Sequence, residues 1–233
     1  MNHITSKRVL KDISDLEKNN LTTHGIYYNV NEENIFNIKV LMIGPQNTPY
    51  QHGYYFFDIN IPDDYPFKPP NVKYCTQNNK TRFNPNLYIN GKVCLSILNT
   101  WSGPQWTSCN NLTTILLSIQ SMVFIENPLH NEPGFENNTS IKNKNYNHLI
   151  TYENFNTAIY NMILNVPSPF KYFLPIMTKL YIDNYDNIIK QIDENIYNDN
   201  KLVECNIYQM KDTLHYSKVK TAIRELYKKI INK

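Results

Sequence analysis

The chain has 233 residues, enough for one large domain or for a domain of about 150 residues with an appendage. A formal charge of +3 is too small to indicate nucleic-acid binding by itself. No window approaches the roughly 18 apolar residues of a membrane span, and the charged N-terminal stretch does not resemble a signal peptide, so we expect neither.

The first predicted element is a helix over residues 6–18, with Ser6 as its candidate N-cap and an apolar stripe along one face. Lys7, Arg8 and Lys11 lie off that stripe. By composition alone, these cations are more consistent with a solvated face than with a docking surface.

Four short β-like runs follow at residues 26–30, 35–44, 54–61 and 71–75, joined by turn-rich links. Links this short favour an antiparallel meander, because parallel strands need long crossover connections. In the third run, apolar and more polar residues alternate, which predicts a half-buried strand.

Residues 83–109 are irregular, and so long a stretch without periodicity is more typical of a functional loop than of filler. Trp101 and Trp106 in it are expected to anchor the core. A strong helix follows over 111–126, with Met122 on its apolar stripe. Three further helices are predicted, over about 147–165, 176–197 and 213–231. The order of elements indicates an α+β fold.

The four cysteines form no CxxC pair and no zinc-like spacing with histidine, which predicts no metal site. Without a secretory signal, we expect reduced thiols and a location in the cytosol, with the nucleus as a second option. Cys75, Cys109 and Cys205 are expected to pack as small apolar residues.

Cys94 is the candidate for nucleophilic chemistry, since a thiolate beside a hydrogen-bond donor can carry an acyl group. Asn86, upstream in the same loop, offers an amide that could order the loop or donate to an oxyanion. Gly91 between them permits a close backbone approach. Spacing alone still favours a core thiol, because a cysteine in an apolar run is usually buried.

The flanking motifs reverse that preference. In order, they are GPQNTPYQHG, YPFKPP, FNPN, VCLSIL and TWSGPQW. Over about residues 1–165 they resemble the catalytic domain of the ubiquitin-conjugating enzyme family. FNPN in place of the usual His-Pro-Asn, the long TWSGPQW loop and NPLHNEPGFE are most similar to the Z-type subfamily. A helical C-terminal extension of that subfamily would correspond to residues 166–233.

The resemblance implies a UBC fold, with an N-terminal helix, a four-stranded meander, a catalytic-cysteine loop and further helices. It implies that Cys94 accepts ubiquitin, or a related modifier, from an activating enzyme as a thioester. A lysine of a protein substrate would then receive the modifier, usually with a ligase. Asn86 matches the asparagine credited with stabilising the oxyanion or ordering the loop. No cofactor, metal, nucleic acid or membrane is implied.

Asn84 departs from the family pattern, and His130 matches it only approximately. Asn84 replaces a histidine that is usually regarded as structural. His130 falls near an acidic residue that gates the incoming lysine, and a neutral imidazole could orient or deprotonate that amine. The longer loop after the cysteine leaves the alignment uncertain here, so Asn131 and Glu132 compete with His130.

The resemblance also assigns partner surfaces. Lys7, Arg8 and Lys11 match the helix face that engages the activating enzyme, which reverses the preference for a solvated face. Phe67 and Pro104 match positions that contact a ligase, although Phe67 could equally staple its own loop.

Three alternatives stay open at this stage. A non-catalytic UBC-like binding module would lack the nucleophile, which this chain retains as Cys94. A papain-like hydrolase would need a histidine base, but Asn84 occupies the loop position. The basic last helix could pack on the catalytic domain, select an activating enzyme or bind an acidic partner.

Overall fold

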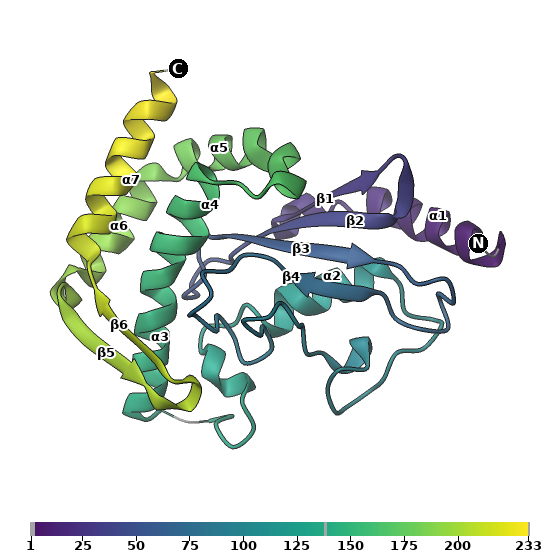
Figure 1. The fold of residues 1–233 in the computed structure, drawn as a ribbon, viewed down its shortest axis with the longest axis horizontal. Coiled ribbons are helices and arrows are strands. Elements are labelled where there is room, and N and C mark those ends of the chain that lie inside the picture. The colour runs from purple at the N-terminus through teal and green to yellow at the C-terminus, as the bar shows by residue number, and fades with distance from the viewer. Residues whose placement is uncertain (1–2, 138, 233) are drawn as a thin grey trace.

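The computed structural model describes residues 3–137 and 139–232. Its centre is a sheet whose strands pair in chain order, which confirms the predicted antiparallel meander (Figure 1). The strands are β1 (Ile26–Asn31), β2 (Asn34–Ile43), β3 (Tyr54–Asn60) and β4 (Asn71–Tyr74).

The two helices predicted before residue 127 are present, but the second ends at Met122 instead of residue 126. Helix α1 (His3–Lys18) starts before Ser6, so Ser6 lies inside the helix and its assignment as N-cap is wrong. Helix α2 (Leu112–Met122) is capped by Asn111, whose Oδ1 accepts from the Thr114 amide at 2.9 Å.

The helix predicted to begin near residue 147 starts earlier in the structure. It comprises α3 (Ile141–Glu153), a π-helix (Asn154–Asn161) and α4 (Met162–Leu164). Within the described part of the chain, no helix is both long and apolar enough to cross a membrane.

Residues 166–233, which we call the extension, contain helices and also a hairpin that was not predicted. The single helix expected over 176–197 is divided into two at Asn184, and the last helix begins at Tyr216 instead of residue 213. The helices are α5 (Leu174–Asp183), α6 (Tyr185–Asn195) and α7 (Tyr216–Ile231). The hairpin pairs β5 (Lys201–Cys205) with β6 (Met210–Leu214) and packs on α3. Figure 1 shows the hairpin, α6 and α7 on the side of α3 and α4 that faces away from the sheet.

Strand β3 is buried on both faces, so the prediction of a half-buried strand is wrong. Tyr55 points into the main core, where its ring lies 4.8 Å from that of Phe124. Phe56 points the opposite way and stacks on Phe170 of the extension, with 4.6 Å between ring centroids. The extension therefore covers the outer face of the sheet, at Phe56.

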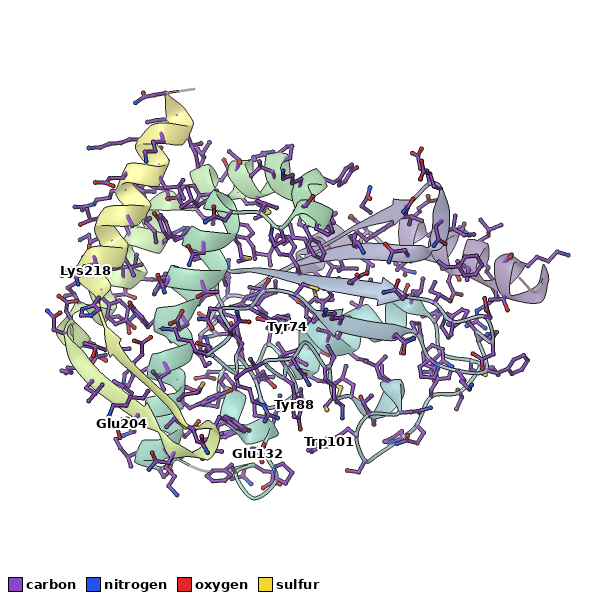
Figure 2. All side chains as sticks on the ribbon, in the orientation of Figure 1. Tyr74, Tyr88, Trp101, Glu132, Glu204 and Lys218 are labelled. Atoms are coloured by element: carbon purple, nitrogen blue, oxygen red, sulfur yellow. The ribbon has the colours of Figure 1, made fainter. Side chains whose placement is uncertain are left out.

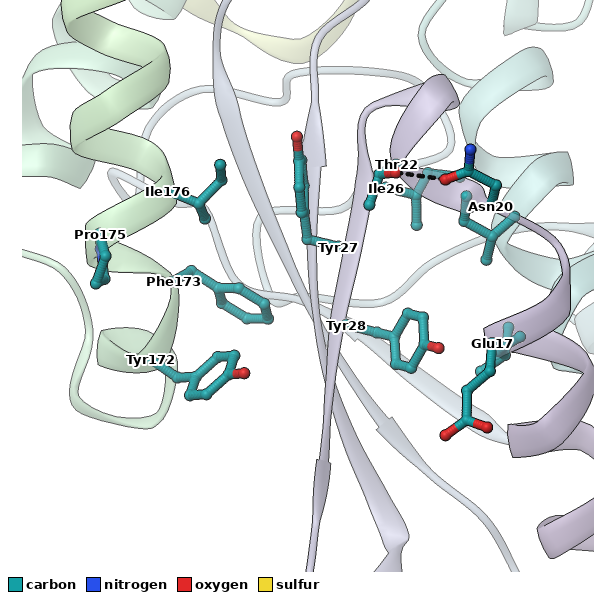
Figure 3. A pocket seen from close by; sticks show the side chains of 12 residues that line it. Glu17, Asn20, Thr22, Ile26, Tyr27, Tyr28, Tyr172, Phe173, Pro175 and Ile176 are labelled. Carbon is teal, nitrogen blue, oxygen red and sulfur yellow. Dashed lines mark hydrogen bonds between the residues drawn. The ribbon is translucent and has the colours of Figure 1, made fainter.

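The extension also reaches the N-terminal helix across the edge strand β1. An apolar groove of about 560 Å³ lies there, between the end of α1, β1 and the start of α5. Figure 3 shows Tyr172 and Phe173 of the extension on one side of this groove and Tyr28 of β1 facing them. The packing of the extension thus reaches this edge of the sheet.

If the extension is part of the core, Phe170→Ala should lower the free energy of unfolding by about 3–5 kcal/mol, the usual loss for a buried phenylalanine. Tyr172→Ala is the matched control, because Tyr172 is 69% exposed. Urea unfolding followed by tryptophan fluorescence measures both. Equal small losses would mean that the stacked rings contribute little.

Candidate active site

The loop of residues 83–94, here called the cysteine loop, folds back so that Asn86 and Cys94 exchange two hydrogen bonds. The Cys94 amide donates to the Asn86 carbonyl at 2.9 Å, and Asn86 Nδ2 donates to the Cys94 carbonyl at 2.6 Å. The turn between them needs Gly91, with φ +91° and a carbonyl that accepts from the Tyr74 amide at 2.8 Å. A Cβ at Gly91 would lie 2.9 Å from the Tyr74 carbonyl, which confirms the predicted close approach.

The buried side chain of Asn84 holds this loop to its surroundings. Its Nδ2 donates to the Val123 carbonyl at 2.8 Å and to the Tyr50 hydroxyl at 3.0 Å. Its Oδ1 accepts from the Asn86 amide at 2.8 Å and from Asn131 Nδ2 at 3.3 Å. A carboxamide offers two donors and one twice-accepting oxygen, whereas a neutral imidazole offers one donor and one acceptor. Asparagine therefore suits a position where four partners converge.

Tyr50 connects Asn84 to the GPQNTPYQHG turn. Its hydroxyl donates to the Phe83 carbonyl at 2.7 Å, and burial raises the pKa of this phenol well above its usual value, so it stays a donor. The turn can close only with glycine at Gly44, because a Cβ there would lie 1.7 Å from the Tyr50 carbonyl oxygen. Through Tyr50, the motif thus holds the start of the cysteine loop at Phe83 and Asn84.

A cleft of about 510 Å³ lies beside the cysteine loop. Asn86, Leu95 and Trp101 line it from the loop and the segment after it, and Met122 and Asn131 line it from the opposite side. Cys94 is 1% exposed and directly precedes Leu95, which lines the cleft. A reaction at its sulfur therefore requires movement of the side chains around it.

Two expected core residues are instead part of this cleft. Met122 is 53% exposed, because α2 ends at this residue and no further helical turn covers it. Trp101 is 38% exposed, so its assignment as a core anchor is wrong. Trp106 does anchor the core, and its indole N–H donates to the Pro66 carbonyl at 2.7 Å.

The segment after Cys94 is held by Thr100. The Thr100 hydroxyl accepts from the Leu95 amide at 2.9 Å and donates to the Val93 carbonyl at 2.8 Å. These bonds lie on both sides of Cys94, so the backbone at Cys94 is fixed by its own loop.

The three residues that compete for the gating position point in different directions. Asn131 lines the cleft and donates to the Met122 carbonyl at 2.8 Å. The His130 ring instead has Nε2 at 3.2 Å from Asn143 Nδ2 on α3. Glu132 accepts a hydrogen bond from Tyr208 of the extension. The role of His130 as gate or base stays a prediction.

The basic residues of α1 divide into two kinds. Lys7 and Lys11 are exposed. Arg8 pairs with Asp12, with 2.8 Å from Nε to Oδ1, and donates to the Ser108 carbonyl at 2.7 Å. Arg8 therefore ties α1 to the segment before α2, and the two lysines are free to meet a partner.

The predicted ligase-contact residues lie on neighbouring loops. Phe67 is 75% exposed, which argues against its acting only as a loop staple, and Pro104 is also exposed. The bond from Trp106 to the Pro66 carbonyl joins their two loops. The structure thus presents both residues to solvent on loops held together.

The remaining cysteines differ in burial. Burial, with a smaller contribution from Asp58, raises the pKa of the Cys75 thiol to about 11, and burial also raises that of Cys205. Cys109 is exposed in the turn before α2, so its predicted packing is wrong. No group of three or more His, Cys, Asp or Glu residues that could hold a metal occurs among residues 3–137 and 139–232.

Comparison with known proteins identifies the family of this chain. The family model described as ubiquitin-conjugating enzyme matches residues 8–167. This chain belongs to that family. It is 41% identical over 181 residues to ubiquitin-conjugating enzyme E2 Z of Xenopus tropicalis, covering 77% of this chain and 57% of that protein. The Homo sapiens E2 Z is 40% identical over 184 residues, covering 77% and 50%. The predicted similarity to the Z-type subfamily is confirmed.

A solved structure supports the fold assignment. The ubiquitin conjugating enzyme E2 domain of Toxoplasma gondii matches with a TM-score of 0.51 and 26% identity, over 66% of this chain and 98% of that one. The expected UBC fold is therefore confirmed. The chain spans about half the length of the curated relatives it matches.

The sequence analysis missed Tyr50, Thr100 and the contacts of the extension with the site. Tyr50 lies in a quoted motif, so the glycine on either side of it could have indicated a tightly closed turn around that residue. Nothing in the local sequence marks Tyr208, because its partners Arg82 and Glu132 are far away in the chain.

Replacement of Asn84 tests whether its amide holds the loop. Asn84→Ala should reduce the free energy of unfolding by about 2–3 kcal/mol, because buried partners lose their hydrogen bonds. Asn90→Asp, at an exposed position in the same loop, keeps the acceptor for the Lys92 amide and should change it by no more than about 0.5 kcal/mol. Urea denaturation compares the two, and similar losses would remove Asn84 from this role.

Proposed function

We propose that this chain accepts ubiquitin, or a related modifier, as a thioester on Cys94 and transfers it to a lysine of a protein substrate, usually with a ligase. The observation that carries the proposal is the reciprocal pair of hydrogen bonds between Asn86 and Cys94 beside the cleft. We place the reaction in the cytosol or the nucleus.

The proposed reaction has two balanced steps. In the first, the Cys94 thiolate attacks the carbonyl carbon of the modifier's C-terminal acyl group, and the bond to the activating enzyme's cysteine breaks, releasing that thiolate. In the second, the neutral lysine amine attacks the same carbon, the bond to Cys94 breaks with release of the Cys94 thiolate, and the proton of the amine passes to solvent water as the amide forms. Because a thioester is already activated, neither step requires a metal or a cofactor.

Two roles of Asn86 are compatible with its contacts. Its 2.6 Å bond to the Cys94 carbonyl orders the loop around the nucleophile. The amide carries a second N–H, which could donate to the oxyanion of the tetrahedral intermediate. A donor of that kind typically contributes about 2.7–4 kcal/mol to the transition state.

The non-catalytic alternative has no observation in its favour. A binding module needs neither Cys94 nor the bonds that hold the loop around it, and the structure retains both. A papain-like hydrolase would need a histidine beside the cysteine, whereas the side chain bonded to Cys94 is that of Asn86.

The decisive test mixes the protein with activating enzyme, ATP and ubiquitin, followed by a non-reducing gel. We expect an adduct that a thiol reagent removes, and none with Cys94→Ala. Cys109→Ala should charge normally, since Cys109 is exposed and lies outside the cleft lining. No adduct on the wild-type chain with competent activating enzymes would overturn the proposal.

The exposed lysines of α1 should govern recognition by the activating enzyme. Reversing both charges, as Lys7→Glu with Lys11→Glu, should slow charging about 10-fold at low salt, because steering by opposite charge is lost. The control reverses Lys228 and Lys229, two exposed cations on α7. If the α7 pair slows charging instead, α7 rather than α1 meets the activating enzyme.

A further inference from the structure

Tyr208, at the turn of the β5–β6 hairpin, contacts two segments that flank the cleft. Its ring contacts the guanidinium of Arg82, with Cζ 4.3 Å from the ring centroid, and the same Cζ lies 3.7 Å from the centroid of the Tyr88 ring. Its hydroxyl donates to Glu132 Oε2. In the view of Figure 2, Tyr88 and Glu132 lie between the hairpin turn and Trp101 of the cleft.

Arg82 connects Tyr208 to the cysteine loop. Arg82 Nη2 donates to the carbonyl of Pro85 at 2.5 Å, and Pro85 directly precedes Asn86. The Arg82 amide also faces Met210 of β6, with 3.3 Å from N to Sδ. The hairpin therefore contacts both the side chain and the backbone at the start of the cysteine loop.

Glu132 connects Tyr208 to the opposite wall of the cleft, because it is the chain neighbour of Asn131. Glu132 follows Asn131, which lines the cleft and donates to Asn84 Oδ1 at 3.3 Å. Burial and the bond to Glu132 raise the pKa of the Tyr208 hydroxyl, so it remains a donor throughout the physiological range. One side chain of the extension thus contacts Arg82, which is bonded to the loop on one side of the cleft, and Glu132, which adjoins the wall on the other side.

The hairpin that carries Tyr208 is itself firmly attached. Val203 and Leu214 are buried, and the hairpin packs on α3. Lys80 bridges Asp212 of β6 and Glu153 of α3, at 2.5 and 3.0 Å. Tyr208 is therefore anchored to the helix layer and can act as a fixed support for the loops that it touches.

We propose that Tyr208 is a positioning residue for the transfer reaction, which sets the spacing of the two cleft walls through Arg82 and Glu132. This inference rests on the proposed function of Cys94. Tyr208 is not among the residues that line the cleft, so its effect passes through Pro85–Asn86 on one side and Asn131–Asn84 on the other.

The test measures discharge of the ubiquitin thioester to free lysine, after charging is stopped by removal of ATP, across a range of lysine concentrations. Tyr208→Ala should lower the maximal discharge rate about 10- to 100-fold, the cost of a small misplacement of reacting groups, and leave the half-saturating lysine concentration unchanged. Tyr208→Phe keeps the ring on Arg82 and should recover part of the rate. Tyr197→Ala, at an exposed extension tyrosine that contacts Lys201, should match wild type.

The outcomes separate this inference from the proposed function. A wild-type chain that never charges contradicts the proposed function alone. Wild-type discharge by a folded Tyr208→Ala variant overturns the inference, as does a rise in half-saturating lysine with an unchanged maximal rate.

A second comparison covers the case in which Tyr208→Ala does not fold. Tyr208→Phe and Glu132→Ala remove the same hydrogen bond, so the double variant should discharge no more slowly than the slower single variant. Multiplicative losses, or wild-type rates in both single variants, would overturn the inference.

Discussion

The buried amide of Asn84 is the contact on which the site depends. It joins the turn that carries Tyr50, the end of α2 at Val123, the cysteine loop at Asn86 and the cleft wall at Asn131. Each partner left unpaired in this interior would cost about 1–3 kcal/mol, so the four segments hold one arrangement. The position of Cys94 follows, because its backbone is bonded to Asn86.

The extension completes the fold around this centre. Phe170 covers Phe56 on the outer face of the sheet, which would otherwise present a large aromatic ring to water. From there the chain passes through α5 and α6 to the hairpin, whose turn returns to the cysteine loop. The same segment therefore buries the second face of the sheet and borders the site. The boundary predicted between residues 165 and 166 stays a prediction, and it does not separate two independent cores.

Sequence patterns predicted the parts of the molecule that depend on local order. Short turn-rich links identified the meander, and the motifs around Cys94 identified the family. Two of the wrong predictions concern residues at the ends of α2. Met122 continues the stripe of α2 but lies over the cleft, and Cys109 lies in an exposed turn. The hairpin was missed because Glu204, Lys211 and Asp212 make its strands look like a polar loop, and only α3 supplies the surface that buries their other face.

The sequence by itself determined which chemistry is available and which turns can close. Cys94 and Asn86 are recognisable from their motifs, and Gly44 and Gly91 stand where a side chain would collide with backbone. Only the tertiary structure decided which of the neighbours His130, Asn131 and Glu132 faces the cleft, and that Tyr208 contacts Arg82 and Glu132 on either side of it. The physical reason is that a turn is set by the sterics of adjacent residues, whereas these contacts join positions far apart in the chain and exist only after the core has packed.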